Sequence, residues 1–125
     1  MTTTRPLSDH ERAILLRLVE VQGGPRELIE QVNAAEFGQP WFEGSQSFSI
    51  VIPLDMPKYA GGMRTMNGAA TVGHASVYQG GVAIDENYVG GMMLWTQDGL
   101  LADLEYSWTT DEMPTSLPPL EDIVG

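Results

Sequence analysis

The sequence predicts an α+β fold, in which two N-terminal helices pack on a mostly antiparallel sheet of about four to five strands. Apolar residues recur at helical spacing in the first third of the chain, and later segments alternate in short β-rich runs. The gaps between these runs are too short to hold crossover helices, so the strands should be antiparallel. With 125 residues, the chain should form a single domain, 1–125, around one core.

The two helices are expected near residues 8–21 and 25–36. Ser8 followed by Glu11 is a capping-box signature that predicts where the first helix begins. Gly23 and Gly24 should end this helix, and Pro25 suits the first position of the next one. The expected apolar stripes are Ile14, Leu15, Leu18 and Val21 in the first helix, and Leu28, Ile29, Val32 and Phe37 in or near the second.

The sheet should begin near residues 46–52, where Phe48, Ile50 and Ile52 alternate with smaller side chains until Pro53 stops the strand. Residues 54–73 contain several glycines and no sustained period, which indicates a long mobile loop or an irregular edge. Residues 75–84 are typical of two short strands around a glycine turn. A turn at 85–87 then leads into a strand at 88–97.

The stretch GGMMLWTQDGLLADLEYSW, residues 90–108, predicts a hairpin around Asp98-Gly99. The length of the loop, two or three residues, stays open, and so does the cross-strand pairing. Within strand 100–108, alternation predicts one face with Ala102, Leu104, Tyr106 and Trp108, and an opposite face with Leu101, Asp103, Glu105 and Ser107. The acidic face fits either an ordinary solvated sheet or a docking surface for a basic partner.

Negative charge is concentrated in the second half of the chain, and the formal net charge is −11. Residues 1–64 contain all six basic residues and eight acids, a net charge of −2, whereas residues 65–125 contain nine acids and no basic residue, which accounts for the other −9. This surface should repel nucleic acids and anionic membranes and attract a basic protein, unless it serves only solubility. The candidate partner-binding residues are Asp85, Glu86, Asp98, Asp103, Glu105, Asp111 and Glu112.

The location and chemistry of the chain follow partly from features that are missing from the sequence. No apolar run reaches the 18 residues of a membrane helix, and the N-terminus lacks a signal-peptide pattern, so a cytoplasmic protein is expected. The absence of cysteine excludes disulfides and thiolate chemistry. We expect no catalytic residues, no cofactor and no metal site, because the only histidines, His10 and His74, are not at ligand spacing.

An alternative function uses the Gly-rich segment 60–74. Its backbone N–H groups could bind an anion or another small ligand, with Arg64 and His74 nearby, although the segment lacks the lysine and the following helix of a phosphate loop. A ligand-binding or enzymatic domain therefore stays open beside the protein-binding module. A structural partner or a homodimer, using an exposed sheet edge or the Met and Trp surface, is a third possibility.

Two resemblances extend this interpretation. The ending DGLLADLEYSWTTDEMPTSLPPLEDI, in which a DG turn leads into an acidic strand and a Pro-rich acidic tail, resembles the endings of many small bacterial α+β proteins. In being small, acidic, cysteine-free and without a catalytic set, the chain is also similar to the immunity proteins of polymorphic and contact-dependent toxin systems. That second resemblance implies a rigid protein that neutralises a cognate toxin by occlusion and docks its acidic side on a basic toxin domain.

Overall fold

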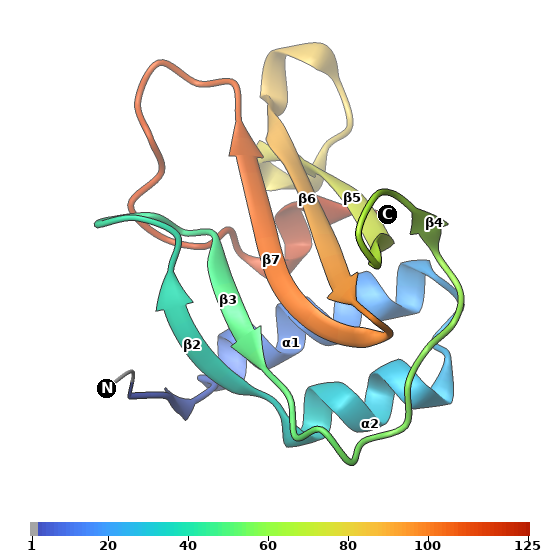
Figure 1. Ribbon diagram of the computed structural model, residues 1–125. Helices are drawn as coiled ribbons and strands as arrows, with labels where there is room; N and C mark the ends of the chain where they lie inside the picture. The colour runs from blue at the N-terminus through green and yellow to red at the C-terminus, as the bar shows by residue number, and fades with distance from the viewer. Residues whose placement is uncertain (1–2) are drawn as a thin grey trace.

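The computed structural model describes residues 3–125 and contains two helices on one face of an antiparallel sheet (Figure 1). The predicted α+β class is confirmed, but the sheet has eight strands, more than the four to five predicted, with the order β1-β2-β3-β7-β6-β5-β4 and β8 beside β5. Three of these strands have only two residues. The elements are β1 (Arg5–Pro6), α1 (Asp9–Val21), α2 (Arg26–Ala34), β2 (Glu36–Pro40), β3 (Phe48–Val51), β4 (Met63–Arg64), β5 (Ala69–Tyr78), β6 (Tyr88–Gln97), β7 (Leu100–Trp108) and β8 (Ile123–Val124).

Helix α1 begins at the predicted capping box. The Ser8 hydroxyl accepts a hydrogen bond from the Glu11 N–H at 3.1 Å, and the Ser8 N–H donates to Glu11 Oε1 at 2.7 Å. The Glu11 carboxylate also binds the Arg5 guanidinium at 2.8 Å, so this buried acid is paired as well as capping. At the other end, the helix packs so closely on β5 that a side chain at Gly73 would lie 2.7 Å from the Leu18 carbonyl oxygen.

Helix α2 is shorter than predicted. It ends at Ala34, because residues 36–40 form β2, which pairs with both β1 and β3. Phe37, which the sequence pattern placed near one face of the helix, instead stacks on Phe48 with ring centroids 4.6 Å apart and carries the Arg5 guanidinium 3.9 Å above its ring. The pairing of β2 with its neighbours and the stacking of Phe37 therefore outweigh the helical sequence pattern at the predicted last turn of α2.

The hairpin formed by β6 and β7 agrees with the prediction and settles its loop length. Gln97 pairs with Leu100, so the loop has two residues. Asp98 has φ +52° and Gly99 has φ +88°, the left-handed conformations that two-residue hairpin loops favour.

A register shift in β7 corrects the predicted face of Leu101. Trp95 pairs with Asp103, but the next residue of β6, Thr96, pairs with Leu101, so Ala102 is the extra residue of a β-bulge. The bulge reverses the alternation, and Leu101, only 2% exposed, lies in the core with Leu104 instead of beside the acids.

The segment from 53 to 84 also differs from the prediction. Within the expected loop, Met63–Arg64 pairs with β5, and β5 itself begins at Ala69 and continues for ten residues. The predicted pair of short strands at 75–84 is wrong, because residues 79–81 form a 3₁₀ turn and residues 82–84 form no strand. Gly80 and Gly81 both have positive φ, which ends β5 without starting a tight hairpin.

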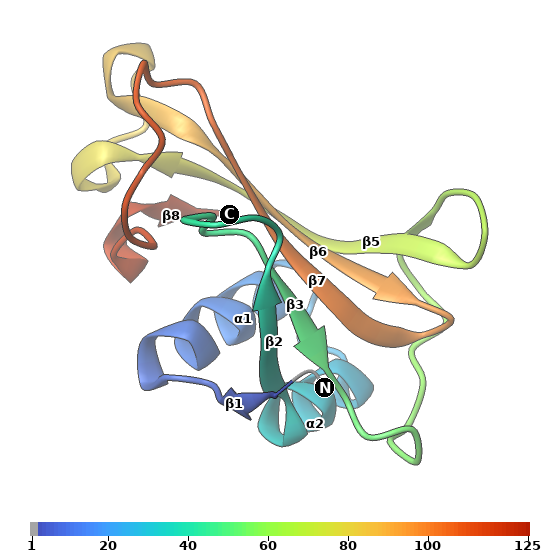
Figure 2. The same cartoon turned by 60° about the vertical axis from the view of Figure 1, so that its left-hand side comes forward.

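The core lies between the two helices and one face of the sheet, as Figure 2 shows from the side. Leu18 of α1 and Leu28 of α2 are fully buried, as are Leu94 and Leu104 on the facing strands. We call this the inner face of the sheet. Neither helix covers the opposite face, which we call the outer face.

One polar side chain is fully buried beneath the β6–β7 turn. Gln31 of α2 has 0% exposure, and its amide donates to the carbonyls of Pro57 at 2.8 Å and Gly99 at 2.9 Å. Its Oε1 accepts from the Leu101 N–H at 2.8 Å. Gln31 therefore links α2, the segment after β3 and the hairpin turn through hydrogen bonds that satisfy both ends of its amide.

Candidate functional site

The outer face brings the acids of β7 beside the aromatic residues of its neighbours. Period two places Asp103 and Glu105 on this face, as the sequence predicts, and the strand register pairs them with Trp95 and Met93 of β6. Trp41, in the connection between β2 and β3, is 47% exposed and reaches the same surface. Carboxylates and indole rings therefore share a sheet face that no helix covers.

Each of the two carboxylates is held by one indole. Trp41 Nε1 donates to Asp103 Oδ1 at 3.0 Å, and Trp95 Nε1 donates to Glu105 Oε1 at 2.9 Å. The Ser107 hydroxyl donates to the other Glu105 oxygen at 3.3 Å. We call Trp41, Trp95, Asp103 and Glu105 the tryptophan–carboxylate site. They line a hollow of about 260 Å³ together with Ala69, Thr96, Gln97 and Ala102.

The surroundings of Asp103 make it unfavourable for this carboxyl to be ionised beside an ionised Glu105. Burial raises the pKa of the Asp103 carboxyl above its ordinary value of 3.8; the Trp41 hydrogen bond offsets part of this, and the neighbouring Glu105 charge adds to it. Among residues 3–125, the ion pairs are Arg5–Glu11 and Arg26–Glu30, so no internal cation neutralises either carboxylate. A cation supplied from outside would relieve the repulsion between them.

The other candidate partner-binding acids lie away from this site. Asp98 occupies the β6–β7 turn, at one end of the hairpin. Asp85 and Glu86 precede β6 in a 3₁₀ turn, and Asp111 and Glu112 follow β7, so these four residues flank the opposite end of the hairpin. Of the seven acids predicted for partner binding, Asp103 and Glu105 are the two that belong to the tryptophan–carboxylate site.

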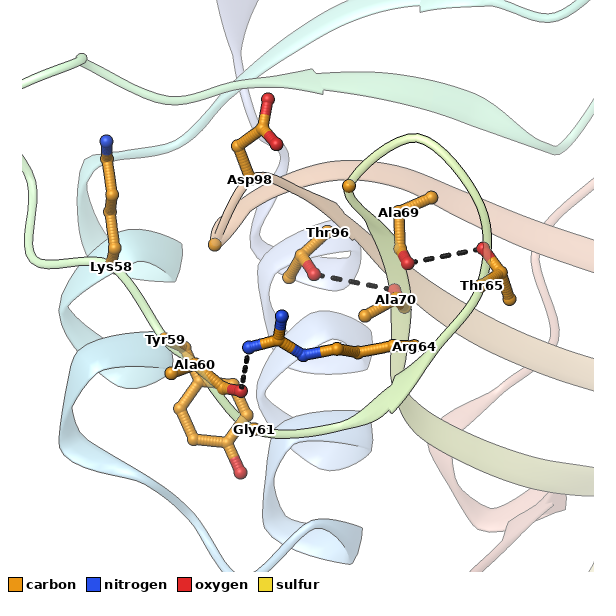
Figure 3. Close-up of a pocket in the computed structure, with 12 residues that line it drawn as sticks. Lys58, Tyr59, Ala60, Gly61, Arg64, Thr65, Ala69, Ala70, Thr96 and Asp98 are labelled. Atoms are coloured by element: carbon orange, nitrogen blue, oxygen red, sulfur yellow. Dashed lines mark hydrogen bonds between the residues drawn. The ribbon is translucent and has the colours of Figure 1, made fainter.

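The alternative site is divided between two hollows. Arg64 lines one of about 330 Å³ with Lys58, Asp98 and the backbone of the Gly-rich segment, and it donates to the Ala60 carbonyl at 3.3 Å (Figure 3). His74 lines a different hollow with Met63, Met93 and Trp95, next to the tryptophan–carboxylate site. Arg64 pairs with buried Ala70 and points toward the inner side of β5, whereas His74 is exposed and lies outside. The two residues do not form one site.

The two histidines lie in different elements, His10 in α1 and His74 in β5. His10 makes its hydrogen bond with the Pro118 carbonyl oxygen, at 2.9 Å. No group of three or more His, Asp or Glu side chains in this part of the chain could hold a metal ion. Within the same residues, no helix is both long enough and apolar enough to cross a membrane.

Three residues that complete these sites did not emerge from the sequence pattern. Trp41 follows β2 in a segment with no clear period, and only the fold carries it over β3 to Asp103. Trp95 could be placed opposite the acids only with the hairpin register and the bulge at Ala102. Lys58 lies five residues beyond Pro53, and its nearness to Arg64 depends on the path of the connection between β3 and β4. The signal available in the sequence was the presence of tryptophans, with Trp95 in the same hairpin as the two acids.

Comparison of the chain with protein-family models, with curated proteins and with solved structures gives no match in any of the three searches.

Proposed function

We propose that the chain is an acidic protein-binding module that docks a basic partner on the outer face of its sheet. The resemblance to immunity proteins extends the proposal to neutralisation of a cognate bacterial toxin by occlusion. The observation that carries it is the tryptophan–carboxylate site, where indole hydrogen bonds fix Asp103 and Glu105 on a sheet face that no helix covers, and where no cation of residues 3–125 pairs with them.

The composition of this surface suits a protein partner. Aromatic residues are enriched at the centres of interfaces, and the exposed rings of Trp41 and Phe42 offer apolar area beside the acids. The excess of nine acids after residue 64 would steer a basic partner toward this half of the chain and speed its encounter. Carboxylates already held in place lose little side-chain entropy when the partner binds.

Charge reversal tests the proposal. Changing Asp103 and Glu105 to Lys should weaken binding of a basic toxin domain by several kcal/mol, because attraction is replaced by repulsion between like charges. The matched control reverses Glu20 and Glu27, which lie on the helices, and should have a much smaller effect. Circular dichroism would establish that both variants fold, and titrations at two salt concentrations would report the electrostatic share.

Two results would contradict the proposal. Equal losses from the sheet and helix reversals would mean that net charge alone matters. Binding that is insensitive to both salt and the reversals would remove the outer face as the docking surface.

A second candidate function is binding of a small anionic ligand in the hollow of Figure 3. The observation that favours it is that Lys58 and Arg64 both line this hollow, together with exposed backbone at Gly68. Figure 3 shows the Lys58 side chain extending away from Arg64, and Asp98 lines the hollow as well. A rise in melting temperature with sugar phosphates, lost in Lys58→Ala and Arg64→Ala, would support this function. No shift with sugar phosphates or nucleotides would argue against it.

A further inference from the structure

The tryptophan–carboxylate site has the size of a recognition pocket for one side chain. Its hollow of about 260 Å³ equals the volume of roughly eight or nine liquid water molecules, which suits a single side-chain head group. Trp41 and Trp95 lie among its walls, and both acids of the site line it as well. A ligand that fits must therefore combine positive charge with a surface that can pack on indole rings.

Part of each carboxylate is left for an incoming donor. Asp103 uses Oδ1 for Trp41, and no described residue donates to its Oδ2. Glu105 uses Oε1 for Trp95, and its Oε2 receives only the long Ser107 bond of 3.3 Å. Successive outward residues of a strand lie about 6.6 Å apart, so one cation with several donors can address both acids.

These features favour a guanidinium over an ammonium group. Arginine has five N–H donors in a planar fork that matches carboxylate geometry, and its plane stacks on aromatic faces. Lysine carries a compact, strongly hydrated charge that must give up more water to enter a hollow walled by indoles. We propose that the hollow between Trp41 and Trp95 is a specificity pocket for an arginine side chain of the partner protein, an inference that rests on the proposed function and specifies how it recognises its partner.

The three tryptophans provide a direct test by NMR. The probes are arginine and lysine as capped single amino acids, N-acetylated and N-methylamidated, titrated into ¹⁵N-labelled protein at low salt. The arginine probe should shift the indole N–H signals of Trp41 and Trp95 in a saturable manner and bind roughly tenfold more tightly than the lysine probe. Trp108 does not line this hollow, although it lines a neighbouring one with Trp41 and Glu105, so its signal should shift less than those of Trp41 and Trp95.

Matched variants assign the effect to the site. Asp103→Asn removes one charge but keeps an acceptor for the Trp41 indole, and should reduce affinity for the arginine probe several-fold. Asp111→Asn removes an equal charge from the exposed segment after β7 and should leave that affinity unchanged. Equal loss in both variants would overturn the inference, as would the absence of any saturable shift at millimolar probe.

Different experimental results would contradict the arginine pocket and the proposed function. Equal affinities for the arginine and lysine probes would overturn the specificity pocket but leave a salt-sensitive docking face intact. A partner whose binding ignores the Asp103 and Glu105 reversals would instead remove the proposed function, and that result comes from the partner titration rather than from the probes.

Discussion

Replacing Gln31 with Met isolates the contribution of the buried amide. Met has nearly the same length and volume as Gln and a similar helix propensity, so the change alters hydrogen bonding with little cavity formation. In the variant, the buried Leu101 N–H loses the acceptor that it has at 2.8 Å. The Pro57 carbonyl also loses its donor, whereas the Gly99 carbonyl still accepts from the Tyr59 N–H at 2.9 Å.

The expected loss of stability depends on the hydrogen bonds that these three backbone groups lose or keep. An unsatisfied buried polar group costs about 1–3 kcal/mol, and the partly solvated Pro57 carbonyl adds less, so Gln31→Met should reduce the free energy of unfolding by about 2–4 kcal/mol. Gln31→Glu should cost more at neutral pH, because an ionised carboxylate would face two carbonyl oxygens. Burial raises the pKa of such a carboxyl, so that variant should regain stability as pH falls and the group becomes a donor.

Urea denaturation followed by tryptophan fluorescence measures both effects. Gln79→Met, at an exposed position in the turn after β5, is the control for replacing Gln by Met and should change stability by less than about 0.5 kcal/mol. A loss below about 1 kcal/mol for Gln31→Met would refute the claim that the amide stabilises the hairpin turn.

Three further substitutions test the core and the two perturbed acids. Leu104→Ala, at a fully buried position, should cost about 2–5 kcal/mol in urea denaturation, and a loss under about 1 kcal/mol would mean that this face of β7 does not pack against the helices. Asp103→Asn should stabilise the fold at neutral pH, because the folded-state pKa of Asp103 lies above 3.8 and ionisation of this carboxyl therefore opposes folding. The stability gained by the variant over wild type should shrink as pH falls toward the folded-state pKa of Asp103. A stability gain that grows in acid would contradict the raised pKa. Glu11→Gln should destabilise the fold at neutral pH, because the Arg5 hydrogen bond lowers the pKa of Glu11 below 4.5. The difference in stability between the variant and wild type should narrow as pH falls through the folded-state pKa of Glu11. Thermal melts at several pH values would measure this difference.

Local signals in the sequence were sufficient for much of the fold. The capping box at Ser8, the Asp98-Gly99 turn and the limits of β6 and β7 each depend on short-range chemistry, and the structure agrees with them. Long-range pairing explains the differences. The two-residue strands β1, β4 and β8 exist because neighbouring segments offer hydrogen bonds, and no periodicity can develop in two residues.

The candidate site was predictable only in part, for the same reason. Alternation was enough to place Asp103 and Glu105 together, because no bulge lies between them. The bulge at Ala102 reversed the face of Leu101, and composition gives no reliable sign of such an extra residue. The contact of Trp41 with Asp103 joins positions 62 residues apart, and only the order of the strands brings them together.

Because the helices cover only one face of the sheet, inward and outward residues of each central strand are under different constraints. Residues that point toward the helices are constrained by packing, where the loss of a few methylene groups costs several kcal/mol. Outward residues in the same strands contribute little to the core, so substitutions there change the surface at small cost in stability. A molecule built in this way can exchange one binding specificity for another while retaining a single scaffold.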